Sequence, residues 1–190
     1  MFSNINEKCL EVLILKEKEI PITSCGSVRK TLRGGKIMRS LIILYSYHHN
    51  NTEKVANVIA QVLEAQVKTP EQVDPEELQE YDLVGFGSGI YGDKHHESLL
   101  SFADRLPSVS KAKAFLFSTS AMINEWKVAD DHSALGEKLQ SKGYTIVDEF
   151  ACKGFNTNSF LKYLGGMNKG RPNSEDLKNA EEFANNLKTK

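Results

Sequence analysis

The sequence contains little cysteine. Its three residues, Cys9, Cys25 and Cys152, lie far apart and form no CxxC pair. An odd, widely spaced set argues against a disulfide framework and against a zinc knuckle. Unpaired thiols in a reducing compartment are the simplest interpretation, so we assign the cysteines no chemistry and expect a cytoplasmic protein.

The sequence also lacks an excess of basic charge and a long hydrophobic run. Its 24 Lys and Arg against 25 Asp and Glu leave a formal net charge of -1, so no global positive field would attract nucleic acid. No apolar run approaches the roughly 20 residues that span a bilayer. The segment CLEVLIL is interrupted by Glu11 and followed by KEKE, which is unlike a signal peptide. We expect no nucleic acid partner and no membrane span.

Residues 1–37 differ in kind from the rest of the chain. They show no sustained hydrophobic period, whereas clear patterning begins at Arg39. They end in RGGKI, followed by Met38, which is what a purine-rich ribosome-binding site and a start codon would encode in frame. We therefore expect a mis-called start before a domain at 38–190. The alternative is a genuine N-terminal extension, either disordered or packed on the domain.

The intact mass of the natively expressed protein tests this hypothesis. The expected mass is that of a chain that starts at Met38, because translation would begin just after the encoded ribosome-binding site. A chain that starts at Met1 would contradict it.

The domain alternates strand-like and helix-like segments. Strand-like runs occupy 40–46, 82–89, 113–120 and 144–152, and a short segment at 66–70 leads into an acidic stretch at 71–82, expected to be a solvated loop with one helical turn. Helical patterns occupy 52–65, 96–106, 130–143 and 175–187. We predict five strands in a doubly wound parallel sheet with helices on both faces. Ligands of such sheets bind beyond the carboxyl ends of the strands.

The loop after the first strand, within YSYHHNNTEKVA, is a candidate phosphate site. A helix N-terminus attracts phosphate through its free N–H groups, and Thr52 is also a plausible helix cap. An ordinary capped turn is the alternative. A Walker loop is excluded, since the turn has no glycine or lysine. GSGIYG, at Gly87 to Gly92, matches the dinucleotide pattern, but DKHHES separates it from the next helix and no acid ends the next strand to bind a ribose.

These residues carry a resemblance to the flavodoxin family. ILYSYHHNNTEKVA resembles its phosphate loop, with Asn51, Thr52 and Ala56 in register. GFGSGIYGDKHHESLL resembles the third-strand loop of flavodoxin-like proteins, including the menaquinone-dependent protoporphyrinogen oxidases, and FSTSAM resembles the fourth-strand loop. The resemblance implies a flavodoxin-like sheet of order 2-1-3-4-5.

The resemblance also implies FMN as the cofactor. The residues that it assigns to FMN are Ser46, Tyr47, His48, His49, Asn50, Asn51, Thr52, Ser88, Gly89, Ile90, Tyr91, Gly92, Ser118, Thr119 and Ser120. The sequence departs from the family where Tyr47, His48, His49 and Asn50 occupy the usual hydroxyl and glycine positions. Asn50 is the mildest change, since asparagine tolerates positive φ, and the two histidines are the most unusual.

The flavin ring has candidate neighbours on the third and fourth loops. Glycines 87, 89 and 92 are expected to let the backbone approach the ring. Tyr91 is the first candidate for stacking, with Met122 and Trp126, the latter placed on a loop, as candidate opposite walls. Histidines near the flavin, His49 and His95, would raise its potential as pH falls.

The two histidine pairs, at 48–49 and 95–96, raise the alternative of a metal site. Adjacent residues in a turn usually point apart, and no cysteine or carboxylate stands at a ligand-like spacing. We therefore predict no metal. His132 is expected to be a solvated helix residue.

Three functions are consistent with these patterns. The first is an FMN-binding carrier between redox partner proteins, with no catalytic residue of its own and with Asp93, Glu125 and the acidic stretch 71–82 steering a basic partner. The second is a flavin-dependent oxidoreductase acting on a quinone or a protoporphyrinogen-type substrate. Residues 153–172 would then form a substrate wall, with Phe155, Phe160, Tyr163, Lys169 and Arg171. The third is a binding module that has lost the cofactor. The sequence does not indicate whether the protein is a monomer or an oligomer.

Overall fold

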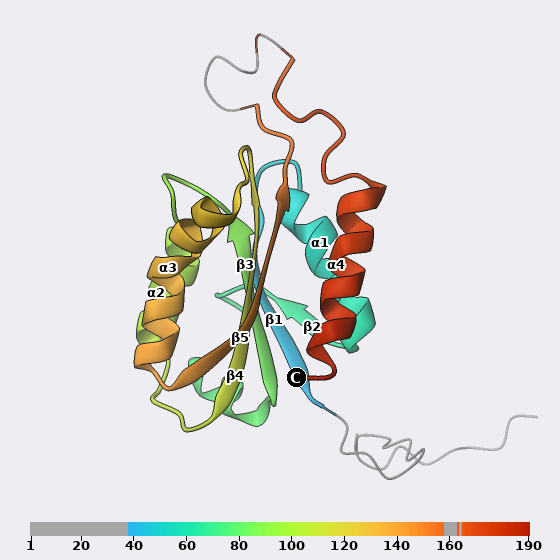
Figure 1. Ribbon diagram of the computed structural model, residues 1–190. Coiled ribbons are helices and arrows are strands. Elements are labelled where there is room, and N and C mark those ends of the chain that lie inside the picture. The colour runs from blue at the N-terminus through green and yellow to red at the C-terminus, as the bar shows by residue number, and fades with distance from the viewer. Residues whose placement is uncertain (1–37, 158–162, 164) are drawn as a thin grey trace, which may run out of the picture. The chain divides into compact units, whose positions relative to one another are not determined.

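The computed structural model describes residues 38–157, 163 and 165–190 (Figure 1). The predictions on residues 1–37, including Cys9 and Cys25, and on Phe160 lie outside the described residues.

The described residues form one parallel sheet with helices between its strands. The elements are β1 Ser40–Tyr45, α1 Asn51–Leu63, β2 Gln66–Lys68, the 3₁₀ helix η1 Pro75–Glu80, β3 Leu83–Gly89, α2 Glu97–Arg105, β4 Ala112–Ser120, α3 Glu125–Ser141, β5 Tyr144–Lys153 and α4 Ser174–Leu187. The sheet order is β2-β1-β3-β4-β5, and each neighbouring pair is parallel. The predicted fold class and strand order are confirmed.

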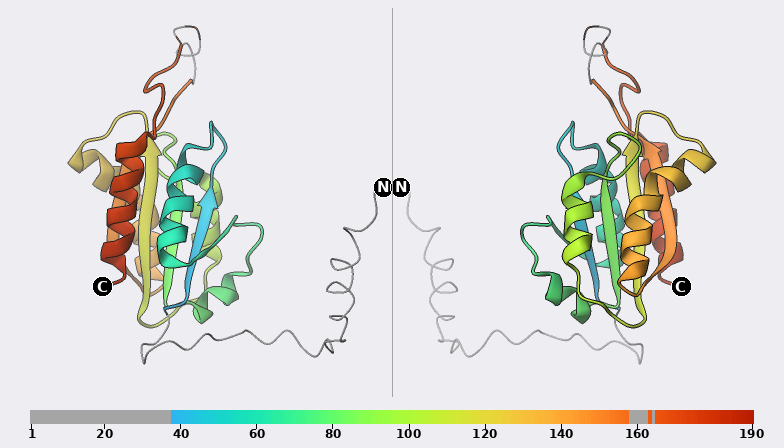
Figure 2. Two further views of the ribbon diagram at one scale, coloured as in Figure 1. Left: turned by 90° about the vertical axis from the view of Figure 1, so that its right-hand side faces the viewer. Right: turned by 90° about the vertical axis from the view of Figure 1, so that its left-hand side faces the viewer.

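Two helices cover each face of the sheet, with α1 and α4 on one face and α2 and α3 on the other (Figures 1 and 2). Alternate strand residues point to the two sides, so Ile43, Phe86 and Leu116 pack with α2 and α3. Phe115 and Phe117 pack with α1 and α4 instead. The strands read as continuous apolar runs because both faces are buried.

Glycines 85 and 87 provide the space for these two phenylalanines. Gly85 lies opposite Phe115 and Gly87 opposite Phe117 on the paired strands β3 and β4. A Cβ on Gly87 would lie 2.1 Å from Phe117 Cζ, far inside van der Waals contact. Gly87 therefore serves packing, and the expectation that it lets the backbone approach a flavin is wrong.

Helix boundaries differ from the sequence predictions in two places. Asn50, not Thr52, is the N-cap of α1. Helix α3 begins at Glu125 rather than near Asp130, because the Asn124 side chain accepts a hydrogen bond from the Lys127 amide and caps the earlier start. Trp126 therefore lies in the first turn of a helix, not on a loop.

The acidic stretch 71–82 contains η1, whose Leu78 is buried, so it is only partly solvated. Because η1 leads into the amino end of β3, it lies at the opposite end of the sheet from the carboxyl-end loops (Figure 2). The η1 residues therefore do not form part of a rim around a site at those loops, whereas Glu71, before η1, lies close enough to His96 to favour its protonated form. Within the described ranges, no helix is both long and apolar enough to cross a membrane.

Candidate functional site

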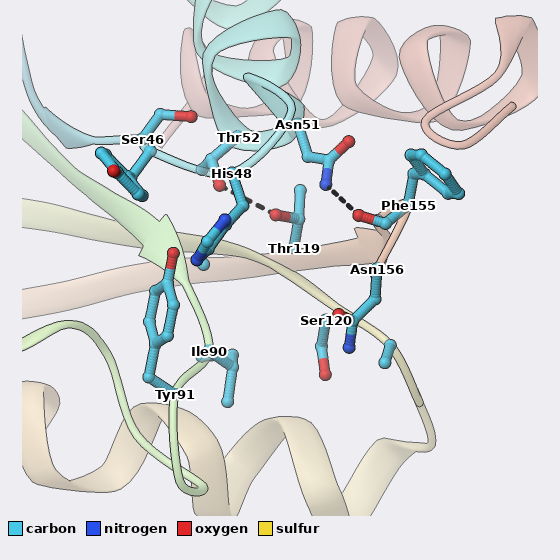
Figure 3. A pocket seen from close by; sticks show the side chains of 14 residues that line it. Ser46, His48, Asn51, Thr52, Ile90, Tyr91, Thr119, Ser120, Phe155 and Asn156 are labelled. Carbon is cyan, nitrogen blue, oxygen red and sulfur yellow. Dashed lines mark hydrogen bonds between the residues drawn. The ribbon is translucent and has the colours of Figure 1, made fainter. Parts of the chain in front are cut away.

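A pocket opens at the carboxyl ends of β1, β3, β4 and β5 (Figure 3). Its lining residues are Ser46, Tyr47, His48, Asn51, Thr52, Gly89, Ile90, Tyr91, Thr119, Ser120, Ala121, Gly154, Phe155 and Asn156. Tyr91 and Ile90 lie on one side of it, and Phe155 and Asn156 on the other. The lining contains no aspartate, glutamate, lysine or arginine, so a ligand would be held by hydroxyls, amides, the His48 imidazole and backbone groups.

The loop between β1 and α1 forms a concave turn at the pocket. His49 and Asn50 both adopt left-handed backbone conformations, with φ of 57° and 52°, and Asn51 then begins the helix. Such a left-handed to right-handed succession turns consecutive N–H groups toward one point, and the helix N-terminus adds a partial positive charge. The Ser46 hydroxyl accepts a hydrogen bond from the Glu53 amide and fixes the turn. This arrangement suits an anion.

Two side-chain hydrogen bonds join the start of α1 to the neighbouring strands (Figure 3). The hydroxyls of Thr52 and Thr119 lie 2.8 Å apart, and Asn51 Nδ2 donates to the Phe155 carbonyl at 2.8 Å. Gly154 permits this close approach, because a Cβ there would lie 3.0 Å from Asn51 Nδ2. The base of the pocket is therefore held together by α1, β4 and the residues directly after β5.

The loop after β3 is a short hairpin beside the pocket. Ile90 and His95 form an antiparallel bridge, and the Tyr91 amide donates to the Lys94 carbonyl at 2.9 Å. Gly92 and Asp93 both have positive φ, as a two-residue turn of type I′ requires. The Ile90 amide donates to the Thr119 carbonyl, which ties the hairpin to β4.

Aromatic and imidazole rings form the wall on this side. Tyr45 stacks on His96 at a centroid distance of 3.7 Å, and Tyr91 meets His96 edge-on at 5.2 Å. Burial, followed by the proximity of Tyr45, raises the pKa of Tyr91, so its hydroxyl stays protonated and can donate. His48 lies 6.1 Å from the Tyr91 ring.

The structure brings together ten of the fifteen residues assigned from the sequence. The ones that line the pocket are Ser46, Tyr47, His48, Asn51, Thr52, Gly89, Ile90, Tyr91, Thr119 and Ser120. The other five, which do not line it, are His49, Asn50, Ser88, Gly92 and Ser118.

Each of these five residues has another place in the structure. His49 Nε2 lies 2.8 Å from the Thr157 hydroxyl, and its ring packs on Phe155. Asn50 and Gly92 shape turns. Ser88 and Ser118 point into the face covered by α2 and α3, because they follow Phe86 and Leu116 by two residues on β3 and β4.

The candidate opposite walls do not line the pocket. Met122 and Trp126 are 63% and 75% exposed, and neither belongs to the lining. Ala121, Gly154, Phe155 and Asn156 line it instead, and the sequence analysis assigned none of them to the cofactor. The position of residues 154–156 directly after the last strand was the signal, since the carboxyl ends of parallel strands share one edge.

His132 was expected to be solvated, but it is 1% exposed. It lies on the inner side of α3, three residues before the buried Leu135, where its ring packs 4.8 Å from that of His95.

Lys127 joins the hairpin to α3 through Asp93, at 2.7 Å, and the buried Asp131, at 2.8 Å. These two hydrogen bonds raise the pKa of Lys127 to about 12. Across the described parts of the chain, no group of three or more His, Cys, Asp and Glu side chains is arranged to hold a metal ion.

Burial of His95 predicts a domain that loses stability in acid. Burial, followed by the proximity of His132, holds the pKa of His95 well below its usual value. Below about pH 6.5 the unfolded chain therefore binds a proton that the folded chain does not. The free energy of unfolding should then fall with pH by up to about 1.4 kcal/mol per pH unit. Urea unfolding across this range measures the slope, and His95→Asn should reduce it; an unchanged slope would contradict the assignment.

Comparison with known proteins agrees with this geometry. A family model described as a flavodoxin domain matches residues 42–154. An uncharacterized protein of Methanocaldococcus jannaschii is 45% identical over 150 residues, which cover 79% of this chain and 98% of that protein.

Solved structures agree in fold. Oxidised flavodoxin 2 of Bacillus cereus is 21% identical with a TM-score of 0.60, covering 80% of this chain and 98% of that one. A flavodoxin of Streptococcus pneumoniae is 18% identical with a TM-score of 0.58, covering 79% and 98%.

Proposed function

This chain belongs to the flavodoxin family, and from that premise we propose that it binds FMN and carries electrons between redox partner proteins. The observation that carries the proposal is the pocket itself, which four strand ends build, without any acidic side chain, around the N-terminus of α1. A bound FMN would supply one- and two-electron transfer, while the protein supplies position and field.

The residues present fit the phosphate of FMN. The concave turn at His49 and Asn50 and the Thr52 amide at the start of α1 offer N–H groups, as a phosphate requires. Ser46, Thr52 and Thr119 add hydroxyls at the same edge. No carboxylate lines the pocket to repel the anion.

The hairpin after β3 fits the flavin ring. Gly89 allows Tyr91 to fold back against the strand end, because a Cβ there would lie 3.1 Å from the Tyr91 ring. Tyr91 thus presents a ring at the pocket and is held on its other side by His96. On this basis Tyr91 orients the flavin ring and Phe155 and Asn156 exclude water from the opposite side.

The surface around the pocket supports docking of a protein partner. Tyr47 and Met122 are exposed on loops at this end of the sheet, and Trp126 is exposed in the first turn of α3. Exposed aromatic and methionine side chains are typical of the centre of protein interfaces. Asp93 is engaged by Lys127, so we propose that apolar contact rather than acidic steering dominates docking. A cytoplasmic location stays a prediction from the sequence.

The visible spectrum of the purified protein tests the proposal. We expect flavin absorbance, with FMN identified by mass in the released cofactor, or reconstitution of the colourless protein by added FMN. Protein that is colourless and cannot be reconstituted would contradict FMN binding.

One observation favours a second candidate, an oxidoreductase with its own quinone or protoporphyrinogen-type substrate. The segment after β5 folds back beside the β4 loop, since Asn156 bridges to Met167 and Asn168 Nδ2 donates to the Ala121 carbonyl at 2.7 Å. It therefore supplies Phe155 to the pocket, as a substrate wall would. Anaerobic oxidation of the reduced protein by quinones, with and without a carrier protein, separates the candidates: direct multiple turnover favours the oxidoreductase.

A further inference from the structure

A layer of hydrogen-bonded serine and histidine side chains lies directly beneath the pocket, on the face covered by α2 and α3. Ser88 and Ser118 lie opposite each other near the ends of β3 and β4. Each serine contacts one buried imidazole, that of His95 at 3.0 Å and that of His132 at 2.8 Å. The next residues along the two strands, Gly89 and Thr119, line the pocket.

The hydrogen bonds around Ser88 determine the tautomer of neutral His95. The Ser88 hydroxyl donates to the Gly89 carbonyl at 2.7 Å and accepts from the His96 amide at 3.0 Å. Since a hydroxyl has only one proton, His95 Nδ1 must donate to it. The neutral His95 therefore has a bare lone pair on Nε2, which is buried and has no hydrogen-bond partner.

His132 connects this interior to solvent. Its Nε2 contacts the Ser118 hydroxyl, and its Nδ1 lies 2.9 Å from Glu149 Oε2. The Glu149 side chain is 39% exposed. Ser118 can donate to a neutral His132 or accept from a protonated one, so His132 keeps its partners in both states. Glu149 thus offers a proton entry to an otherwise buried pair.

The series Ser118, His132 and Glu149 has the hydrogen-bond pattern of a nucleophilic triad, but it does not fit that chemistry. Ser118 is 1% exposed and is absent from the pocket lining. A nucleophile must reach a reacting atom, and no substrate can approach this hydroxyl.

We propose that His95 and His132 form a buried site that binds one proton at a time. The proton enters from solvent through Glu149 when negative charge enters the pocket above. Two imidazoles with centroids 4.8 Å apart repel each other when both are charged, so a single proton is the limit. A neutral His95 before reduction agrees with its lowered pKa, which burial and then the proximity of His132 cause.

The redox coupling in this proposal rests on the proposed FMN function. Electrons from a reductant leave negative charge in the pocket, and that charge favours the cationic form of the pair beneath it. One proton then passes from solvent to the pair, and reoxidation releases it. Other titratable or charged groups stand on the elements packed around the pair: Tyr45 on β1, Asp93 and Lys94 in the hairpin, His96 and Glu97 at α2, Lys127 and Asp131 on α3, and Glu149 on β5.

Proton uptake during anaerobic photoreduction, followed with a pH indicator in weak buffer between about pH 5 and 7, tests the coupling. We expect wild type to take up one more proton per reduced flavin than His132→Gln. Glu149→Gln keeps an oxygen for His132 Nδ1 but removes the charge, so uptake should move to lower pH. Glu137→Gln removes an exposed charge from the same helix and should match wild type. Equal uptake in wild type, His132→Gln and Glu149→Gln at every pH would overturn the proposal.

Histidine NMR of the FMN-free protein tests the pair independently. As pH is lowered, we expect only one of the two imidazoles to gain a proton, and Glu149→Gln should delay that event. Independent titration of both near pH 6.5 would overturn the shared site even if FMN binds normally. If the protein bound no FMN, the carrier function would be refuted. The NMR titration would still support or refute the shared proton site.

Discussion

Gly87→Ala is expected to lower the free energy of unfolding by about 3 kcal/mol, the upper range for overpacking a core. The added Cβ would lie 2.1 Å from Phe117 Cζ, and Phe117 is fully buried between the sheet and helices α1 and α4. Rotation of the ring is opposed by Phe115, whose centroid is 6.0 Å away. Chemical denaturation with urea measures the loss.

A matched glycine provides the control for this substitution. Gly136 lies inside α3, and a Cβ there would meet only Leu116 Cδ1, at 3.8 Å. Gly136→Ala should therefore stabilise the domain by up to about 1 kcal/mol through helix propensity. The packing argument would fail if the free energy of unfolding of the Gly87→Ala protein were no lower than that of the Gly136→Ala protein.

A double-mutant cycle attributes the cost to the phenylalanine. Phe117→Leu removes the atoms nearest to the new Cβ, so Gly87→Ala should cost about 1–2 kcal/mol less in that background than in wild type. Additive costs would show that the strain arises elsewhere in β3.

The role of Gly87 also shows what the sequence could not predict. The strands themselves were predictable, because parallel strands buried on both faces are continuous apolar runs. Which face Gly87 serves depends on the register that places Phe117 beside it. That register is a nonlocal property, so a glycine that accommodates a ring was mistaken for one that approaches a cofactor.

The candidate site was predictable in part for the same reason. Residues directly after β1, β3 and β4 were assigned correctly to one edge, since topology alone brings parallel strand ends together. His132 was missed because the start of α3 was placed near Asp130. Its spacing from the buried Leu135 and Leu139 was a usable signal of an inward position. Its partners, Ser118 and Glu149, are remote in sequence and follow only from packing.

The second large effect is expected at Asn50, where Asn50→Val should weaken FMN binding at least about tenfold, equivalent to 1.4 kcal/mol. Asn50 has φ of 52° and ψ of 32°, and a residue with a Cβ pays about 1–2 kcal/mol in this region, most of all when branched. Relief of that strain would rotate the peptide groups that precede α1 and turn their N–H groups away from the phosphate position.

Asn50→Gly separates this backbone effect from loss of the amide side chain. The Asn50 side chain makes no capping hydrogen bond, so glycine, which adopts positive φ freely, should bind FMN as tightly as wild type. Quenching of FMN fluorescence on titration with FMN-free protein gives both dissociation constants. Equal weakening by valine and glycine would assign the effect to the side chain instead. Because the turn contains no glycine and the neighbouring His49 is also left-handed, the turn proposed to bind phosphate is built in this chain from residues that bear side chains.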